Sequence, residues 1–78
     1  MAMTVTKAQA TEIEAGKCWA VYQAHDSFSA PAGKIWRLFD DVKIAQRIAR
    51  ENMLLGVTEL SLTPGSYGYC DVVADDDA

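Results

Sequence analysis

Three side chains near the start of the chain have the chemical types of a nucleophile, a general base and an orienting acid. They are Cys18, His25 and Asp26. If the segment that carries them is a β-strand, Cys18 and His25 lie on opposite faces and about 23 Å apart. A nucleophile and its base must be within hydrogen-bond reach, so the sequence predicts no catalytic site, and we expect no enzyme.

A metal site built from Cys18, Cys70 and His25 would need closely spaced ligands, such as a C-x₂-C pair, and the sequence has no such pair. It also has no glycine-rich phosphate loop of the G-x-G-x-x-G or Walker type. The sequence therefore predicts no metal and no cofactor. We expect both cysteines to be free thiols, which suits a reducing compartment and predicts a cytoplasmic location.

The charge distribution favours binding as the class of function. The 78 residues have a net charge of −4, with basic side chains concentrated in the middle of the chain. An acidic balance argues against direct nucleic-acid binding, and the lack of a run of about 18 apolar residues argues against a membrane-spanning segment. Residues 56–78 contain five acidic side chains and no basic one: Glu59, Asp71, Asp75, Asp76 and Asp77.

Two interpretations of this acidic end remain open. Clustered carboxylates can imitate the phosphates of a nucleic acid and occupy the basic groove of a protein that handles it. Alternatively, residues 75–78 are a polar tail that only keeps the protein soluble. The first interpretation predicts a protein partner with a basic nucleic-acid-binding surface. Pairing of the basic middle with the acidic end of a second copy also leaves a homodimer open.

The hydrophobic pattern predicts two β-hairpins. Residues 4–13 and 17–25 are rich in residues that favour strands, and Gly16 between them can form the turn. Residues 57–62 and 67–74 alternate between apolar and polar side chains. A Thr-Pro-Gly-Ser turn joins these two segments.

Residues 30–55 change to apolar spacings of three and four, which predicts one long helix that the Asp40-Asp41 pair can break and that Gly56 ends. We therefore expect residues 1–78 to form one small α+β domain. Its antiparallel sheet consists of two β-hairpins in the order ββαββ, with the helix on one face and an acidic tail at 75–78. The predicted core stripe of the helix is Ile35, Leu38, Phe39, Val42, Ala45, Ala49 and Met53.

Some apolar residues of the predicted helix fall outside this core stripe. Ile44, Ile48 and Leu55 form a second stripe, which is either a wider core or a contact surface for a partner or a second copy. Trp36 points to another side, beside Lys43 and Arg47. A Trp flanked by basic side chains suits a protein interface, although it can equally pack beneath a loop. Trp36, Ile44 and Ile48 join the five acidic residues as candidate partner-binding residues.

Residues 28–41, FSAPAGKIWRLFDD, resemble the opening of START or Bet v 1-like domains, which include polyketide cyclases. In that family a strand ends and a helix with an Ile/Val-Trp pair follows. Residues 62–68 are similar to the turn between the next two strands. The resemblance covers about residues 18–74. It implies a small-molecule-binding half-domain that dimerisation completes, with an apolar pocket lined by Trp19, Trp36, Phe39 or Tyr67.

The sequence as a whole predicts a small acidic protein-binding module without catalytic activity. Its most concrete form is a phage or mobile-element inhibitor, of the anti-CRISPR type, that binds a nucleic-acid-handling complex. This form depends on the small size, the acidity and the lack of a catalytic motif. The small-molecule-binding half-domain is the alternative.

Overall fold

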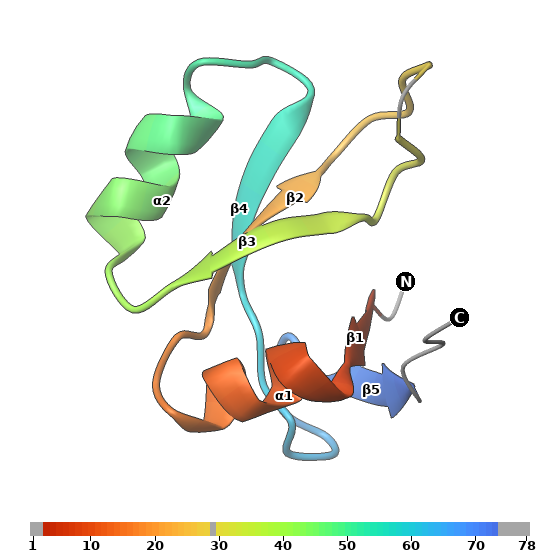
Figure 1. Cartoon of the computed structure of the whole chain (residues 1–78), viewed down its shortest axis with the longest axis vertical. Helices are drawn as coiled ribbons and strands as arrows, with labels where there is room; N and C mark the ends of the chain where they lie inside the picture. The colour runs from red at the N-terminus through yellow and green to blue at the C-terminus, as the bar shows by residue number, and fades with distance from the viewer. Residues whose placement is uncertain (1–2, 29, 74–78) are drawn as a thin grey trace.

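The computed structural model describes residues 3–28 and 30–73, which contain two helices and five strands. The antiparallel sheet has the strand order β3-β2-β4, and a separate parallel pair is formed by β1 and β5 (Figure 1). The α+β class and an antiparallel sheet are thus confirmed, but the element order differs from the prediction. In chain order the elements are β1 (Met3–Thr6), α1 (Lys7–Glu14), β2 (Trp19–Gln23), β3 (Ile35–Phe39), α2 (Val42–Ala49), β4 (Leu55–Glu59) and β5 (Cys70–Val73).

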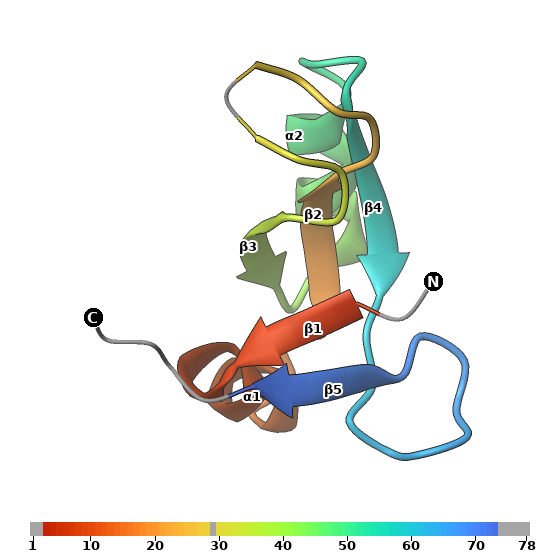
Figure 2. The same ribbon diagram turned by 90° about the vertical axis from the view of Figure 1, so that its right-hand side faces the viewer.

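The two helices pack on different parts of this framework. Helix α2 contacts all three strands of the antiparallel sheet, whereas α1 contacts β1, β3 and β5. Figure 2 shows α2 behind the sheet and the β1–β5 pair crossing below it. Among the described residues, neither helix is long and apolar enough to cross a membrane. The main core cluster consists of Val5, Ala10, Ile13, Ala20, Ile35, Leu38, Leu60 and Cys70.

Helix α1 replaces most of the strand that was expected at residues 4–13. A capping box starts the helix: the Gln9 N–H donates to Thr6 Oγ1 over 3.2 Å, and the Thr6 N–H donates to Gln9 Oε1 over 3.0 Å. The T-x-x-Q pattern is a helix-start signature, and here it outweighs the β-propensity of the segment. The first predicted hairpin is therefore wrong, because β1 instead pairs with β5, with Met3 opposite Cys70.

Strand β3 lies where the first half of the long helix was expected. A β-bulge at Trp36 separates the pairing of Ile35 with Tyr22 from the pairing of Arg37 further along the strand. The bulge turns Ile35 and Leu38, which are three residues apart, toward the same buried core. Their spacing imitates the stripe of a helix, and for this reason the periodicity predicted the wrong element.

The prediction of one long helix over residues 30–55 is therefore wrong, and only α2 (Val42–Ala49) is helical in this segment. Asp41 caps α2, since its Oδ1 accepts from the Lys43 N–H over 2.8 Å, so the chain does change element at the predicted break. Gly56 lies within β4 and does not end a helix. Met53, predicted to be in the core, lies beyond the helix and is 92% exposed.

The second predicted hairpin is also wrong, although its turn is confirmed. The Ser66 N–H donates to the Thr63 carbonyl over 3.1 Å, and Gly65 has φ +85°. The flanking segments meet only at an isolated parallel bridge, Ser61 with Tyr69. Strand β4 instead pairs with β2 over five residue pairs, and strand β5 pairs with β1 over four.

The close approach of Gly68 to β4 gives a test of the fold. Gly68 has φ +77°, and a Cβ there would collide with the Glu59 carbonyl oxygen, whereas Gly65 faces open space. We expect Gly65→Ala to lower the free energy of unfolding by about 1 kcal/mol, through its left-handed backbone alone. Gly68→Ala should lower it by about 3 kcal/mol, because the backbone must also move. Urea denaturation measures both; equal losses would contradict the close approach.

Candidate functional site

Two loops extend beyond one end of the antiparallel sheet, in the upper part of Figure 1. The first joins β2 to β3 and the second joins α2 to β4. Between them lie two adjoining hollows of about 230 and 500 Å³, which share Ser27 and Leu54. We term them together the loop cleft, lined by Gln23, Asp26, Ser27, Phe28, Trp36, Asn52, Leu54 and Leu55.

Hydrogen bonds fasten the two loops to each other. The Leu54 carbonyl in the second loop accepts from the Ala24 N–H over 2.7 Å and from the His25 N–H over 3.3 Å. Within the first loop, Asp26 Oδ1 accepts from the Ala32 N–H over 2.7 Å. These bonds hold the walls of the loop cleft in place without a contribution from a ligand.

A buried glutamine positions the tryptophan of the cleft. Gln23 is 3% exposed, and its Nε2 donates to the His25 carbonyl over 2.7 Å. Its Oε1 accepts from the Trp36 Nε1–H over 3.0 Å, so both ends of the amide have partners. The Lys34 ammonium lies 4.1 Å from the centroid of the Trp36 ring, which is the distance of a cation–π contact. The ring is thereby fixed while remaining 43% exposed.

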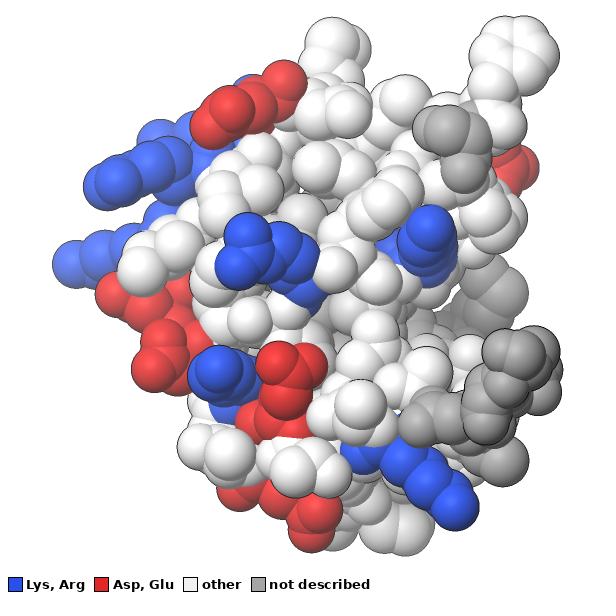
Figure 3. Space-filling model, viewed as in Figure 1, with Lys and Arg blue, Asp and Glu red and all other residues white. Residues whose placement is uncertain are grey.

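The rim of the loop cleft exposes large apolar side chains. Phe28 on the first loop is fully exposed, with a relative accessibility of 111%, and Met53 on the second loop is 92% exposed. Figure 3 shows this upper end of the molecule as largely uncharged, whereas Lys and Arg gather at the left, over α2. An apolar, rigid and concave end of this kind is typical of an interaction surface.

The structure separates the predicted apolar contact residues. Trp36 lines the loop cleft, but it lies on β3 beside Lys34 and not on a helix beside Lys43 and Arg47, as was expected. Ile44 and Ile48 lie on α2; Ile44 is 43% exposed and Ile48 is half-buried. Neither of them lines the loop cleft.

The two described members of the acidic set are both exposed. Glu59 ends β4, and its Oε2 accepts a hydrogen bond from the Cys18 thiol over 3.8 Å. Asp71 on β5 accepts a hydrogen bond from Tyr69, and this bond together with the carboxylate charge raises the pKa of the Tyr69 hydroxyl. Three of the predicted residues lie outside the described part of the chain: Asp75, Asp76 and Asp77.

The thiols and the histidine do not assemble into a reactive group. Cys18 and His25 lie beyond opposite ends of β2. Cys18 and Cys70 are free, and burial raises the pKa of both thiols, with the Glu59 carboxylate adding to the effect at Cys18. Protonated thiols are poor nucleophiles. Within residues 3–28 and 30–73, no three His, Cys, Asp or Glu side chains come together as a metal site.

The aromatic residues of the implied ligand pocket lie in different places. Trp36 lines the loop cleft, whereas Tyr67 lines a hollow with Met3 and Leu60. The pair Ile35-Trp36 is on a strand, where the resemblance to START or Bet v 1-like domains implied a helix. Comparisons of the chain with protein-family models, with curated proteins and with solved structures found no match.

Of the eight residues that line the loop cleft, only Trp36 was among the predicted binding residues. Phe28 is one of those that were missed, and Met53 lies beside the cleft in the chain, between the lining residues Asn52 and Leu54. Phe28 falls between the predicted strand at 17–25 and the predicted helix at 30–55, so the sequence already placed it in a connecting segment. Met53 gave no such signal, because its spacing placed it in the predicted core stripe. Its exposure follows only from the early end of α2.

The link between Gln23 and Trp36 can be tested by removing the amide. We expect Gln23→Leu to lower the free energy of unfolding by about 2 kcal/mol, because the His25 carbonyl and the Trp36 N–H lose their partner. The exposed Gln46→Leu is the matched control, with a change within about 0.5 kcal/mol. In NMR spectra, the Trp36 indole N–H should shift and exchange faster only in Gln23→Leu; an unchanged indole signal would contradict the link.

Proposed function

We propose that this protein binds another protein through the loop cleft and catalyses no reaction. The observation that carries the proposal is the exposure of Phe28 and Met53 on loops that are hydrogen-bonded to each other. Burying one such side chain in an interface contributes roughly 1.5–3 kcal/mol to the free energy of association. Large apolar and aromatic side chains around a pocket are the usual composition of the energetic centre of an interface.

The rigidity of the cleft supports the same proposal. Trp36 is held by Gln23, and the two loops are held by the Leu54 carbonyl, so binding does not have to order them. A preformed surface loses less conformational entropy on association than a mobile one. The partner that fits presents an apolar side chain, which enters the loop cleft beside Phe28 and Leu54.

The most specific form of the proposal is a phage or mobile-element inhibitor of the anti-CRISPR type, bound to a basic surface of a nucleic-acid-handling complex. Its support is the net charge of −4, the exposed Glu59 and Asp71, and the three aspartates at 75–77. A basic groove attracts carboxylates by the same electrostatics that attract phosphates. The apolar cleft would then add short-range contact that salt does not screen.

We also propose that the protein acts in the cytoplasm. The support is its two free thiols, Cys18 and Cys70, because a reducing compartment keeps cysteines in this state.

The loop cleft is tested by a double variant, Phe28→Ser with Met53→Ser. We expect the affinity for the partner to fall by about 100-fold, since two central apolar contacts are lost. The melting temperature should stay within about 2 °C, since neither side chain is buried.

The partner is first captured from a host lysate with tagged wild-type protein, then purified and titrated. Tyr67→Ser is the control, because Tyr67 is 89% exposed but lies outside the cleft. Equal binding by the double variant would contradict the proposal.

The acidic interpretation is tested separately by changing Asp75, Asp76 and Asp77 together to Asn. We expect the stability to be nearly unchanged and the affinity for a basic partner to fall by about tenfold at low salt. The difference from wild type should shrink at about 0.5 M salt, where exposed charges are screened. An affinity unchanged at low salt would assign this segment to solubility alone.

A further inference from the structure

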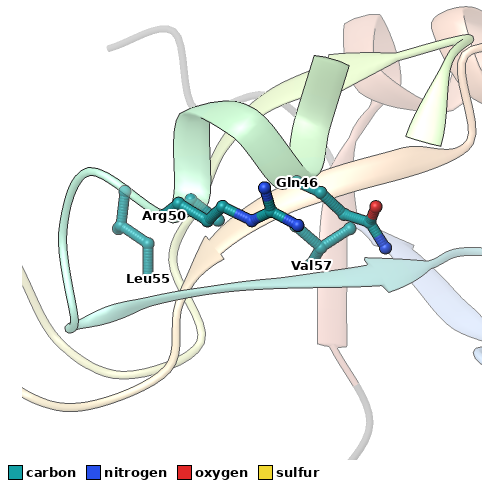
Figure 4. A pocket seen from close by; sticks show the side chains of 5 residues that line it. Gln46, Arg50, Leu55 and Val57 are labelled. Atoms are coloured by element: carbon teal, nitrogen blue, oxygen red, sulfur yellow. The ribbon is translucent and has the colours of Figure 1, made fainter. Parts of the chain in front are cut away.

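A second hollow lies between α2 and the outer edge of β4, and its charge differs from that of the loop cleft. It has a volume of about 350 Å³. Figure 4 shows the side chains of Arg50 and Gln46 extending from α2 over Val57, with Leu55 beside them. We term it the helix–strand groove, lined by Gln46, Ala49, Arg50, Leu55 and Val57.

The backbone of β4 is open along this groove, because among residues 3–28 and 30–73 β4 is an edge strand that pairs only with β2. Two backbone hydrogen bonds, one at each end of the ladder, fix which of its groups face β2. The Ala24 N–H donates to the Leu54 carbonyl over 2.7 Å, and the Leu60 N–H donates to the Cys18 carbonyl over 2.8 Å. Bonding direction alternates along an antiparallel strand, so the odd-numbered residues of β4 face outward. Val57 therefore offers both its N–H and its carbonyl to a further strand.

The open edge is short, because it is closed at both ends. The Leu55 N–H is already bonded to the Asn52 carbonyl over 3.0 Å. At the other end, Gly68 packs against the Glu59 carbonyl. The stretch that remains is centred on Val57 and fits a short extended segment better than a long strand of another sheet.

The groove wall formed by α2 carries one cationic side chain, Arg50. Lys43 and Arg47 belong to the same helix, and in Figure 3 the Lys and Arg side chains over α2 have Asp and Glu side chains above and below them. Among residues 3–28 and 30–73, no carboxylate forms an ion pair with any of these cations. A guanidinium has five donors and no acceptor, and its geometry matches a carboxylate. A second copy paired edge to edge through β4 would present its own Arg50 at this edge and no carboxylate for the Arg50 already there, which disfavours that pairing.

We propose that the helix–strand groove binds an extended acidic peptide segment of another protein, which adds to β4 as a further strand. The backbone of the segment pairs with Val57, and one of its carboxylates bonds the Arg50 guanidinium. A small apolar side chain of the segment contacts Ala49 and Leu55 on the groove floor. Glu59 at the far end of β4 repels carboxylates, so the acidic end of the segment lies toward Arg50.

This groove does not depend on the loop cleft. The two surfaces share only Leu55, and the substitutions that test the cleft, at Phe28 and Met53, do not touch the groove. A failure of one proposal is therefore distinguishable from a failure of the other.

The test uses two fluorescent nine-residue peptides, one of alternating valine and aspartate and one with asparagine in place of aspartate. By fluorescence anisotropy at about 50 mM salt, we expect the full-length protein to bind the acidic peptide about tenfold more tightly than the neutral one. Arg50→Glu should abolish this preference. Lys7→Glu, the same charge change on the exposed face of α1, should retain it. In NMR spectra, the Val57 amide should shift on binding.

The comparison of the two peptides needs no protein variant, so it holds even if Arg50→Glu fails to fold. Equal affinities for the acidic and the neutral peptide would overturn the proposal, as would equal effects of Arg50→Glu and Lys7→Glu. Two further versions of the acidic peptide carry N-methyl groups, one on its odd-numbered and one on its even-numbered backbone amides. One of the two should bind weakly, because its methylated amides are those that bond β4. Undiminished binding by both would exclude strand addition. Sedimentation that shows a dimer, with the Val57 amide perturbed, would assign the edge to a second copy and also overturn it.

Discussion

Strand β2 is the one strand of the structure that is paired on both edges, and the rest of the fold depends on it. It is five residues long and pairs with β3 on one side and β4 on the other. Its consecutive residues Ala20 and Val21 point to opposite faces, and both are buried. The face of Ala20 packs against the main core, and the other face is covered by α2, whose Ala45 is fully buried. Small side chains at these positions let the helix and the core approach the strand from both sides.

The same strand determines where the two proposed binding surfaces lie. Its last residue, Gln23, holds Trp36 in place, and the chain immediately after it bonds to the loop before β4. Because the sheet has only three strands, β4 remains at its edge, beside α2. A chain of 78 residues has little material to cover such an end or edge, so a small domain exposes apolar side chains and open backbone that a larger one would bury.

The two surfaces also separate the charge of the molecule. Arg50 lines the helix–strand groove, whereas the upper end that holds the loop cleft is largely uncharged and the exposed Glu59 and Asp71 lie at the end of β4 and on β5. Uneven charge on a small protein steers association and selects partners more than it stabilises the fold. The two proposed modes of recognition therefore differ: apolar contact at the loops, and hydrogen bonds and charge at the edge strand.

The sequence alone was sufficient for the local features. The Asp41 cap, the Thr63–Ser66 turn, the strand around Val21 and the α+β class follow from short-range chemistry, and the capping box of Thr6 and Gln9 could have been found in the same way. Tertiary structure alone decided the pairing of β1 with β5, the edge position of β4 and the exposure of Met53. Strand partners are chosen by long-range competition for ladders and core, which leaves no local mark. The bulge at Trp36 shows most clearly how far sequence periodicity can predict an element, because it gave a strand the apolar spacing of a helix.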